Sequence, residues 1–550
     1  MKGDSMFSKR CLAPIVAAAL VSTLLSAPAA QAQWSSDTST NFSIGDGAGD
    51  QIQPKIAPTN DGGCYISWYS NFPGGYDVRM QRLNAQGEEM WVHNGILIAD
   101  RATTAVSDYV MVTDGVNAYI GFTDDRVTPN QVTVQKVNPA GNLLWNGAAG
   151  VNLGAGNMIG SPPSLALLSD GGIGVIWNNT TAPTQTQIQK VDANGIPQWT
   201  TISQGDPIPP TPRPFSTSDV QAAENGGLVV LFVRCNGSNC NTSARHLYAQ
   251  KYDSAGAPQW GGGLPIAIHT ASGLTNGYFP RFLPDGQGGA VFGWYEGGLN
   301  RDAFIQHILS DGTPKFPASV ANTGSTPGRI RVGAGLAYDA VNEEYYLASS
   351  ETDSATQGQN RVFVQKYDSD GNRLWGDTGV TLLPTTNTTQ PSFVQAQLMG
   401  DGVAVYYMKT TAATTRVVAA ARVNSEQTVV WDVLAASNGG EDKSRLASAI
   451  STCGYHVLAF GNGPSGNGDA RVQNIRTDGT FGNPPPLLGD LDCDGSVDIP
   501  DINPFIQAVI SPAGYSFLHP CCDINNANMN GDAGIDGLDV ANFVNALVNP

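Results

Sequence analysis

A unit that recurs eight times between residues 34 and 482 constrains the fold more than any other feature of this sequence. In its best copy, the alternating pattern that starts at Val362 predicts a strand, Asp368-Ser-Asp-Gly371 predicts a hairpin turn, and Leu374-Trp375 predicts the start of the returning strand. Successive copies lie 52 to 61 residues apart. This spacing is typical of four-stranded propeller blades rather than of solenoid turns.

Each copy pairs a glutamine with a glycine six residues later, and a large aromatic residue follows four positions after the glycine. The glutamine/glycine pairs are Gln81/Gly87, Gln135/Gly141, Gln189/Gly195, Gln250/Gly256, Gln306/Gly312, Gln365/Gly371 and Gln473/Gly479, and Ala421 replaces the glutamine in a degenerate copy. The aromatic residues are Trp91, Trp145, Trp199, Trp260, Phe316, Trp375 and Trp431. The eighth copy carries Asn483 instead, so its aromatic residue is missing.

The missing aromatic residue is explained if the segment 34–44, which begins with Trp34 and precedes the first unit, pairs into the last blade. Such a closure ties the chain ends together and removes an open sheet edge. We therefore predict an all-β fold over residues 33–482: an eight-bladed β-propeller of four-stranded blades with a mixed closing blade. Seven blades and a stray unit are the alternative.

The Gly-x-x-x-Trp spacing resembles the tryptophan-docking repeat of the pyrroloquinoline-quinone-type eight-bladed propellers, in which the tryptophans pack between neighbouring blades. Two features depart from that repeat. The acidic residue lies three positions before the glycine (Asp192, Asp253, Asp368), not four, and glutamine stands where the family usually has alanine. The resemblance implies an architecture and no function.

Residues 1–32 have the pattern of a signal peptide, with basic residues up to Arg10, an apolar run from Leu12 to Leu25 and a small-x-small site at Ala30-Gln31-Ala32. An uncleaved membrane anchor is the alternative, and no later segment is apolar enough to be a span. We therefore expect a secreted, extracellular or cell-surface protein without a membrane span after cleavage.

The net charge and the cysteines agree with export. The chain carries a net charge of −18, and loss of the leader, which contributes +2, leaves −20. Such a surface repels nucleic acid. Export also permits disulfides. The pattern predicts a Cys235–Cys240 bridge and a bond from Cys493 to Cys521 or Cys522, while Cys64 and Cys453 are either partners or buried thiols, with an odd count that leaves one thiol over.

The propeller region shows no catalytic constellation, so its catalytic residues are left unknown. Its histidines, His93, His246, His269, His307 and His456, lack a metal-binding spacing. Candidate carboxylates for a glycosidase pair are Glu224, Glu296, Asp302, Glu343 and Glu344, but their spacing does not pair them across blades. Trp68, Trp177 and Trp294 repeat at one blade position, which favours a core role over a sugar-binding face.

The composition changes after a Pro-rich linker, which we place at 483–488. Residues 487–550 contain nine Asp and no Lys, Arg or Glu. Two loops in this region carry oxygen ligands at positions 1, 3, 5, 7, 9 and 12, the spacing that Ca²⁺ binding requires. The ligands are Asp490, Asp492, Asp494, Ser496, Asp498 and Asp501 in the first loop and Asn528, Asn530, Asp532, Gly534, Asp536 and Asp539 in the second.

We expect two Ca²⁺ sites, of which the second is weaker. Asn528 replaces the first carboxylate there, and Ala533 stands where the first loop has the turn-forming Gly495. Each loop leads into a short amphipathic helix, predicted over 501–510 and 539–548. Phe505, Val509, Phe543 and Leu547 should pack the two helices together.

A duplicated calcium loop followed by a single helix, here over residues 489–550, resembles the type I dockerin module. The resemblance implies that the two helices recognise a cohesin-like protein, with Ser-Thr at loop positions 10 and 11. This chain has Ile499-Pro500 and Gly537-Leu538 at those positions, so a divergent partner or docking within the chain stays open. A purely structural role of calcium, which relieves charge repulsion in the tail, is a further alternative.

Two functional hypotheses follow. The first is a secreted, non-catalytic propeller that binds a carbohydrate or protein ligand and is anchored or assembled through the calcium-dependent dockerin-like module. The second is a dockerin-bearing, polysaccharide-degrading O-glycosyl hydrolase. A quinoprotein dehydrogenase ranks behind both, because no residues match a cofactor site.

Overall fold

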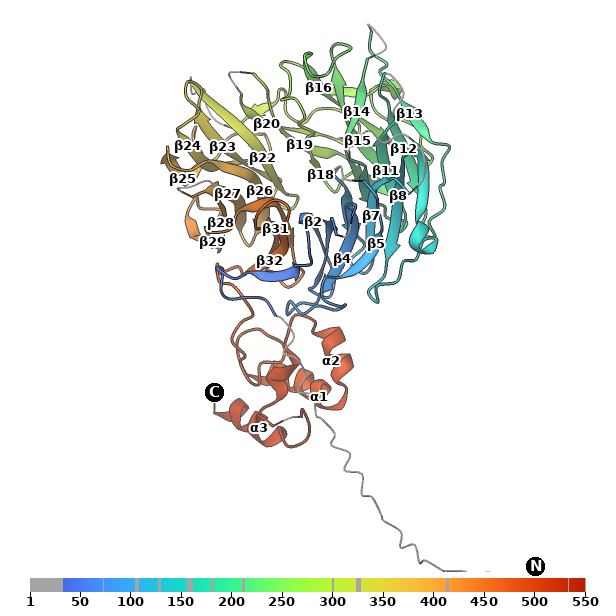
Figure 1. Ribbon diagram of the computed structural model, residues 1–550. Helices are drawn as coiled ribbons and strands as arrows, with labels where there is room; N and C mark the ends of the chain where they lie inside the picture. Colours follow the sequence, from blue (N-terminus) through green and yellow to red (C-terminus); the bar gives the residue numbers. More distant parts are fainter. Residues whose placement is uncertain are drawn as a thin grey trace, which may run out of the picture. The chain divides into compact units, whose positions relative to one another are not determined.

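The computed structural model describes residues 33–549 apart from 73, 104–107, 127–129, 156–161, 180–182, 210–212, 299–300, 323–327, 412–414 and 533. The predicted signal peptide lies outside the described residues. Eight four-stranded antiparallel sheets follow one another along the chain, as Figure 1 shows by their order in colour. The predicted eight-bladed propeller of four-stranded blades is therefore confirmed.

The first four blades take their strands in chain order. Blade 1 consists of β2 (Gln51–Pro58), β3 (Cys64–Ser70), β4 (Asp77–Leu83) and β5 (Ile96–Ala99). Blade 2 consists of β6 (Val110–Thr113), β7 (Ala118–Asp124), β8 (Gln131–Val137) and β9 (Val151–Ala155). Blade 3 consists of β10 (Ser164–Leu167), β11 (Ile173–Asn178), β12 (Thr186–Val191) and β13 (Ile202–Gln204). Blade 4 consists of β14 (Phe215–Ala222), β15 (Leu228–Cys235), β16 (Arg245–Tyr252) and β17 (Ile266–His269).

The remaining blades follow the same order, except that the last one takes a strand from the start of the chain. Blade 5 consists of β18 (Phe282–Pro284), β19 (Ala290–Tyr295), β20 (Ala303–Ile308) and β21 (Val320–Ala321). Blade 6 consists of β22 (Arg329–Asp339), β23 (Glu344–Asp353), β24 (Asn360–Tyr367) and β25 (Val380–Thr386). Blade 7 consists of β26 (Pro391–Met399), β27 (Gly402–Thr410), β28 (Arg416–Val423) and β29 (Val429–Ala436). Blade 8 consists of β30 (Lys443–Ile450), β31 (His456–Asn462), β32 (Asp469–Ile475) and β1 (Phe42–Gly45).

The closing blade joins the two ends of the propeller. Strand β1 pairs antiparallel with β32, with Phe42 opposite Val472, as the sequence predicts. The strand is shorter than the predicted segment 34–44, because Trp34 precedes it and lies outside any strand. The first strands of neighbouring blades contact one another, β26 with β30 and β30 with β2, so they are the innermost strands of the ring.

Tryptophans pack between neighbouring blades by one repeated contact. In six blades an indole Nε1 donates a hydrogen bond of 2.8 to 3.2 Å to the carbonyl two residues before the hairpin glycine of the next blade. The donor and acceptor pairs are Trp34/Ala85, Trp91/Pro139, Trp145/Ala193, Trp199/Ser254, Trp260/Ser310 and Trp431/Thr477. Trp34 thus makes the contact of the eighth blade on the first.

The glycine of the hairpin is required by this contact. At Gly87, which has φ 84°, a Cβ atom would lie 2.7 Å from the ring of Trp34. Any side chain there would both strain the backbone and push the indole away. The turn of blade 7 has no docking glycine, and Gln427 takes the left-handed conformation in its place, with φ 70°.

The glutamine that opens each unit holds the aromatic residue of its own blade. In blade 2, Trp145 N donates to Gln135 Oε1 at 3.0 Å, and Gln135 Nε2 donates to the Trp145 carbonyl at 3.1 Å. The same backbone donation recurs at Trp199, Trp260, Phe316 and Trp375. In blade 8, Gln473 binds the carbonyl of Ser35, beside Trp34. This buried amide explains why glutamine occupies the position.

One prediction about these residues is wrong. The aromatic residue does not begin the returning strand, since β25 starts at Val380, five residues after Trp375. The glutamine contact holds the aromatic residue in the connection ahead of the strand, and only Trp431 lies inside one. The prediction that Trp68, Trp177 and Trp294 belong to the core is confirmed, because all three are at most 1% exposed.

The C-terminal segment is helical, as predicted. It contains α1 (Ile502–Ile510), α2 (Pro512–Leu518) and α3 (Val540–Val548), and α2 was not anticipated by the loop-helix pattern. Short 3₁₀ turns cover Ile499–Asp501 and Ile524–Ala527 here and Gly147–Ala149, Glu224–Gly226 and Gly261–Gly263 in the propeller. None of the helices among the described residues has the length and apolar character needed to cross a membrane.

Three disulfides are present among the described residues. The predicted Cys235–Cys240 bridge is confirmed, and Cys493 pairs with Cys522, one of its two expected partners. Cys453 bonds Cys521, so a Cys64–Cys453 bridge is wrong. Cys64 is the buried thiol left over, and burial raises its pKa to about 12.

Substitution of Trp34 by alanine should destabilise the propeller by about 3 to 5 kcal/mol, because it removes a buried indole and the docking bond that the segment ahead of β1 makes on blade 1. The measurement is the urea midpoint of unfolding. Phe72, which is 57% exposed, is the matched control, and Phe72→Ala should shift stability by less than about 0.5 kcal/mol. Equal midpoints for the two variants would contradict the closure.

Candidate metal centre and candidate ligand cavity

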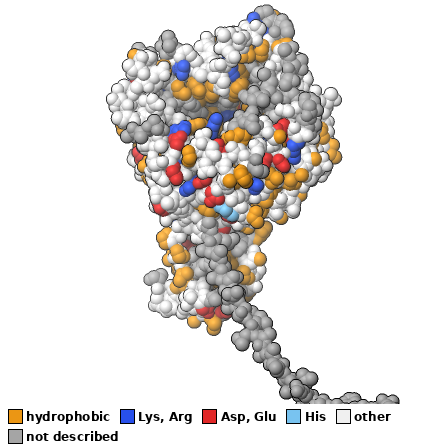
Figure 2. All heavy atoms as spheres, viewed as in Figure 1, with side chains coloured by type: hydrophobic (Ala, Val, Ile, Leu, Met, Phe, Trp, Pro, Cys, Tyr) orange, Lys and Arg blue, Asp and Glu red, His pale blue; other side chains and the backbone are white. Residues whose placement is uncertain are grey.

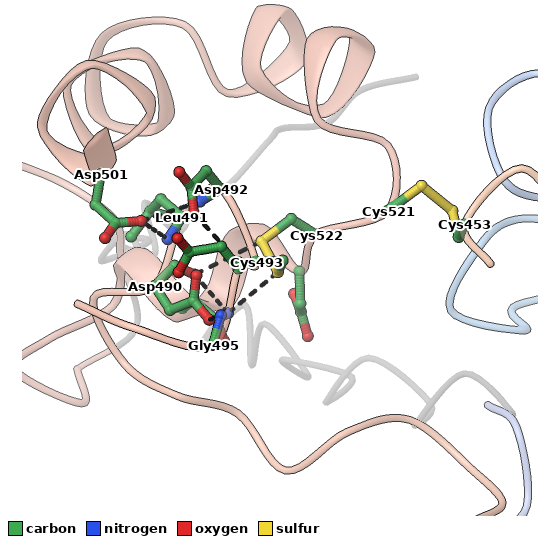
Figure 3. Close-up of a disulfide and its surroundings, with 12 residues drawn as sticks. Cys453, Asp490, Leu491, Asp492, Cys493, Gly495, Asp501, Cys521 and Cys522 are labelled. Atoms are coloured by element: carbon green, nitrogen blue, oxygen red, sulfur yellow. Dashed lines mark hydrogen bonds between the residues drawn. A yellow bond between two sulfur atoms is a disulfide. The ribbon is translucent and has the colours of Figure 1, made fainter. Parts of the chain in front are cut away.

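The first acidic loop brings three of its predicted ligands together. Oxygen atoms of Asp490, Asp492 and Asp494 lie within 4.8 Å of one another, and Figure 3 shows Asp490 and Asp492 beside the disulfide of Cys493. Gly495 has φ 95°, the sharp turn that the sequence predicts at this position. Ser496 and Asp498 are exposed, and the charges of Asp494, Asp501 and Asp492 act on Asp498.

Asp501 fixes the loop rather than pointing freely into it. Its side chain is fully buried, and Oδ1 accepts from Leu491 N at 2.6 Å and from Asp492 N at 3.0 Å. Its Oδ2 accepts from Asp498 N at 2.9 Å. Since Asp501 also stands at the start of α1, its negative charge faces the positive end of that helix.

The electrostatics of Asp490 fit a cation. Its side chain is 5% exposed, Oδ2 accepts from Gly495 N, and Oδ1 is buried without a hydrogen-bond partner in the described part of the chain. Burial raises the pKa of Asp490, and the negative charges of Asp501 and Asp492 raise it further. An unsatisfied buried carboxylate oxygen beside like charges is unfavourable unless a cation binds it. The donor set consists of oxygens, which suits Ca²⁺.

The second loop repeats the framework with fewer charges. Asp539 is fully buried, and its two oxygens accept from Asn530 N at 3.0 Å and Asp536 N at 2.9 Å. These bonds match those of Asp501 to Asp492 and Asp498. Asn528 and Asp532 contact each other, and Gly534 donates to Asp532 Oδ1. Ala533, the predicted weak point, lies outside the described residues.

The two loop-helix units pack against each other as predicted. The rings of Phe505 and Phe543 stack with centroids 4.0 Å apart and an interplanar angle of 1°. Val509 and Leu547 pack on the same core. The unpredicted helix α2 contributes Tyr515, whose hydroxyl donates to the Leu491 carbonyl at 2.8 Å.

The disulfides connect this C-terminal module, residues 489–549, to itself and to the propeller. Cys493, inside the first loop, is bonded to Cys522, and the adjacent Cys521 is bonded to Cys453 in the turn between β30 and β31 (Figure 3). Two disulfides and the peptide bond between Cys521 and Cys522 therefore link the first acidic loop to blade 8. No sequence pattern identifies Cys453 as the partner, because 68 residues separate the two cysteines.

The structure does not assemble the candidate glycosidase carboxylates into one cleft. Glu224 and Glu343 lie in turns between the first and second strands of blades 4 and 6, where they pair with Lys251 and Lys315. Glu296 and Asp302 lie in the connection between the second and third strands of blade 5, which leaves the opposite end of the sheets. Glu344 pairs with Lys366 on blade 6.

Glu296 and Asp302 are joined by a backbone hydrogen bond, whereas Glu343 and Glu344 are adjacent only along the chain. Glu296 N donates to the Asp302 carbonyl at 2.9 Å, and their side chains pair with His269 at 3.1 Å and Arg331 at 3.5 Å. Burial raises the pKa of Asp302, and the charge of Glu296 adds to that shift. The propeller histidines are distributed over blades 1, 4, 5 and 8.

A cavity of about 370 Å³ lies where blade 8 meets blade 1. Gln53 and Arg445, on the innermost strands β2 and β30, contribute to its wall. Both stand in β-bulges with positive φ, 55° and 56°. Sequence reasoning missed them, because a bulge interrupts the alternation that identifies a strand and leaves no motif behind.

The comparisons with known proteins leave the family open. No protein-family model and no curated protein matches this chain. Among solved structures, the polysaccharide lyase PL25 ulvan lyase is similar at 10% identity and a TM-score of 0.43, covering 80% of this chain and 97% of that one.

Two further structures match in the same range. The polysaccharide lyase Uly1 is similar at 12% identity and a TM-score of 0.40, covering 82% of this chain and 98% of that one. The α-L-arabinanase of Penicillium chrysogenum, complexed with arabinobiose, is similar at 12% identity and a TM-score of 0.31, covering 58% and 93%. At these values the similarities carry no functional conclusion, which must come from the residues of this chain.

The substitution Asp490→Asn should separate two effects of the acidic loop: destabilisation of the metal-free fold by charge repulsion, and stabilisation of the fold by bound calcium. Because the pKa of Asp490 is raised in the folded state, its charge destabilises the metal-free fold above that pKa, and the penalty disappears as the pH falls through it. At pH 7 in EDTA the variant should therefore unfold at the same temperature as the parent chain or higher.

In calcium, the parent chain should unfold at a higher temperature than Asp490→Asn. At a calcium concentration of 100 times Kd the parent chain gains about 2.7 kcal/mol per site, and Asp490→Asn should lose the gain of the first site. Calorimetric unfolding in EDTA and in calcium is the measurement. Asp377, which is exposed in the propeller, is the control, and Asp377→Asn should leave the calcium shift intact. A calcium shift of parent size in Asp490→Asn would rule out the first loop as the site.

Proposed function

We propose that this chain is a secreted, non-catalytic propeller that attaches to a cohesin-like partner protein through its C-terminal module when calcium is bound. The single observation that carries the proposal is a pair of matched apolar stripes on the module. Ile502, Ile506 and Ile510 repeat every four residues along α1, and Val540, Val544 and Val548 do so along α3. Residues four apart share one face of a helix.

These stripes are exposed although they are apolar. The exposed fractions are 37%, 47% and 74% on α1 and 43%, 49% and 68% on α3. Orange hydrophobic side chains are visible over this part of the molecule in Figure 2. Contiguous exposed apolar surface marks an interaction site in a soluble protein, and a helix face with such spacing is suited to a groove or flat sheet of a partner.

The stripes extend into the loops at the positions where the dockerin family has Ser-Thr. Ile499 is 78% exposed and Leu538 is 69% exposed. The proposed partner therefore presents an apolar surface, with few hydroxyl acceptors, to this module. Calcium supports the binding indirectly, because it holds each loop and thereby the start of α1 and α3.

The disulfide between Cys453 and Cys521 supports the proposal that the C-terminal module anchors the propeller to a partner. A module that is bonded to blade 8 positions the propeller when it binds a partner. We propose that the propeller supplies the second binding function and takes a carbohydrate ligand. The hydrolase alternative would need a carboxylate pair, and Glu296 with Asp302, which a backbone hydrogen bond joins, is the pair that we would test.

The substitutions Ile506→Lys and Val544→Lys, combined, should weaken binding of a type I cohesin module by at least about 100-fold, because buried apolar anchors dominate such interfaces. The measurement is titration calorimetry of the full chain in calcium and in EDTA, with binding of the parent chain expected only in calcium. Val341, 91% exposed in the turn between β22 and β23, is the control: Val341→Lys should bind like the parent.

Two results would contradict this proposal. Unchanged binding by the double variant would show that the stripes are not the interface. A parent chain that binds no cohesin in calcium would exclude that class of partner.

A further inference from the structure

We infer that the cavity between blades 8 and 1 binds an acidic saccharide, and that Arg445 recognises the carboxylate of its uronic acid unit. This inference rests on the proposed carbohydrate binding by the propeller, for which it supplies the site and the ligand class. The cavity volume of about 370 Å³ falls within the range of small-molecule sites, roughly 300 to 1,000 Å³.

Arg445 has the charge and freedom to bind an anion. Its side chain is exposed, and within the described part of the chain no carboxylate or carbonyl pairs with its guanidinium. By contrast, Arg416 in the same cavity wall is occupied, since its Nε donates to Asp442 Oδ1 at 3.0 Å and Nη2 bonds to Oδ2. In a chain with a net charge of −18, an uncompensated guanidinium in a cavity is an anion site.

The backbone at Arg445 is strained in a way that aims the side chain. Its φ is 56°, a conformation that arginine rarely adopts, in a bulge where β30 loses register with β31. Strand bulges re-aim side chains near binding sites, and strain of this kind persists where the surrounding structure imposes it. The equivalent bulges hold Gly333 in β22 and Phe393 in β26, also with positive φ, so the conformation recurs on the innermost strands while the charge is particular to Arg445.

A second, independent observation comes from Gln53, across the cavity on β2. Its side chain is 6% exposed, and among the described residues its Oε1 is buried without a hydrogen-bond partner. A buried acceptor without a donor is costly. A rotation of the Gln53 amide toward the cavity would let a sugar hydroxyl donate to this oxygen. Gln53 stands, like Arg445, in a bulge with positive φ.

The rest of the wall suits a hydroxylated ring better than an apolar ligand. Tyr76 provides an aromatic side chain, and Ser465 lies in the loop between β31 and β32. That loop is held in place by Asp50, whose Oδ1 accepts from Gly466 N at 2.7 Å and Gly468 N at 3.0 Å. A planar carboxylate can form two parallel hydrogen bonds with a guanidinium, so the uronate group would fix the orientation of the sugar.

The test uses the full chain, in calcium, and two probes of equal length: a trisaccharide of galacturonic acid and the neutral trisaccharide of galactose. Titration calorimetry should show binding of the acidic probe and at least tenfold weaker binding of the neutral one. Arg445→Gln should weaken binding of the acidic probe at least tenfold. Arg476→Gln, which removes the same charge from the opposite end of blade 8, should leave it unchanged.

A further variant keeps the test independent of folding. Arg445→Gly should lose binding in the same way while its thermal unfolding midpoint stays constant or rises, because glycine adopts positive φ readily. If Arg445→Gln binds the acidic probe like the parent chain, the inference is overturned. Binding of both probes with no effect of Arg445 would overturn this site while leaving carbohydrate binding by the propeller in place. Absence of binding to either probe at millimolar concentration would overturn both.

Discussion

The propeller depends on one repeated contact, in which six of the eight blades dock an indole on the hairpin of the next blade. The contact combines three partners: a glycine with positive φ that leaves room for the ring, a carbonyl two residues earlier that accepts from Nε1, and a buried glutamine that holds the backbone of the aromatic residue. The three residue types recur together in most units, and Trp431 docks on Thr477 even though Ala421 replaces the glutamine of its unit. The ring closes because Trp34, from the other end of the chain, makes the same contact on blade 1.

The C-terminal module depends on the opposite kind of interaction. Nine Asp and no Lys, Arg or Glu lie in residues 487–550, and the buried Oδ1 of Asp490 has no hydrogen-bond partner among the residues that the structure describes. The module compensates with backbone donors to Asp501 and Asp539, a stacked Phe505–Phe543 pair and two disulfides. These features hold the loop framework in shape, and the remaining like charges are the reason why we propose a cation as their partner.

The sequence predicted those parts that repeat. Eight blades, the shared closing blade, the buried Trp68 class and the two loop-helix units all follow from periodic spacing, which reports directly on local geometry. It could not predict that Trp375 precedes its strand, since the Gln365 contact is a side-chain effect, nor that Cys453 pairs with Cys521, since that bond joins distant segments. Gln53 and Arg445 were missed for a related reason. A β-bulge interrupts the alternation of apolar and polar residues along a strand. Gln53 and Arg445 line the cavity from such bulges, so the strand pattern does not identify them.

The most direct test of the account is calcium titration calorimetry on the full chain. The account predicts two binding events per chain, with the second weaker because Asn528 replaces a carboxylate of the second loop. An absence of calcium binding at millimolar concentration would contradict it, and the C-terminal helices would then have to present their apolar stripes without the metal.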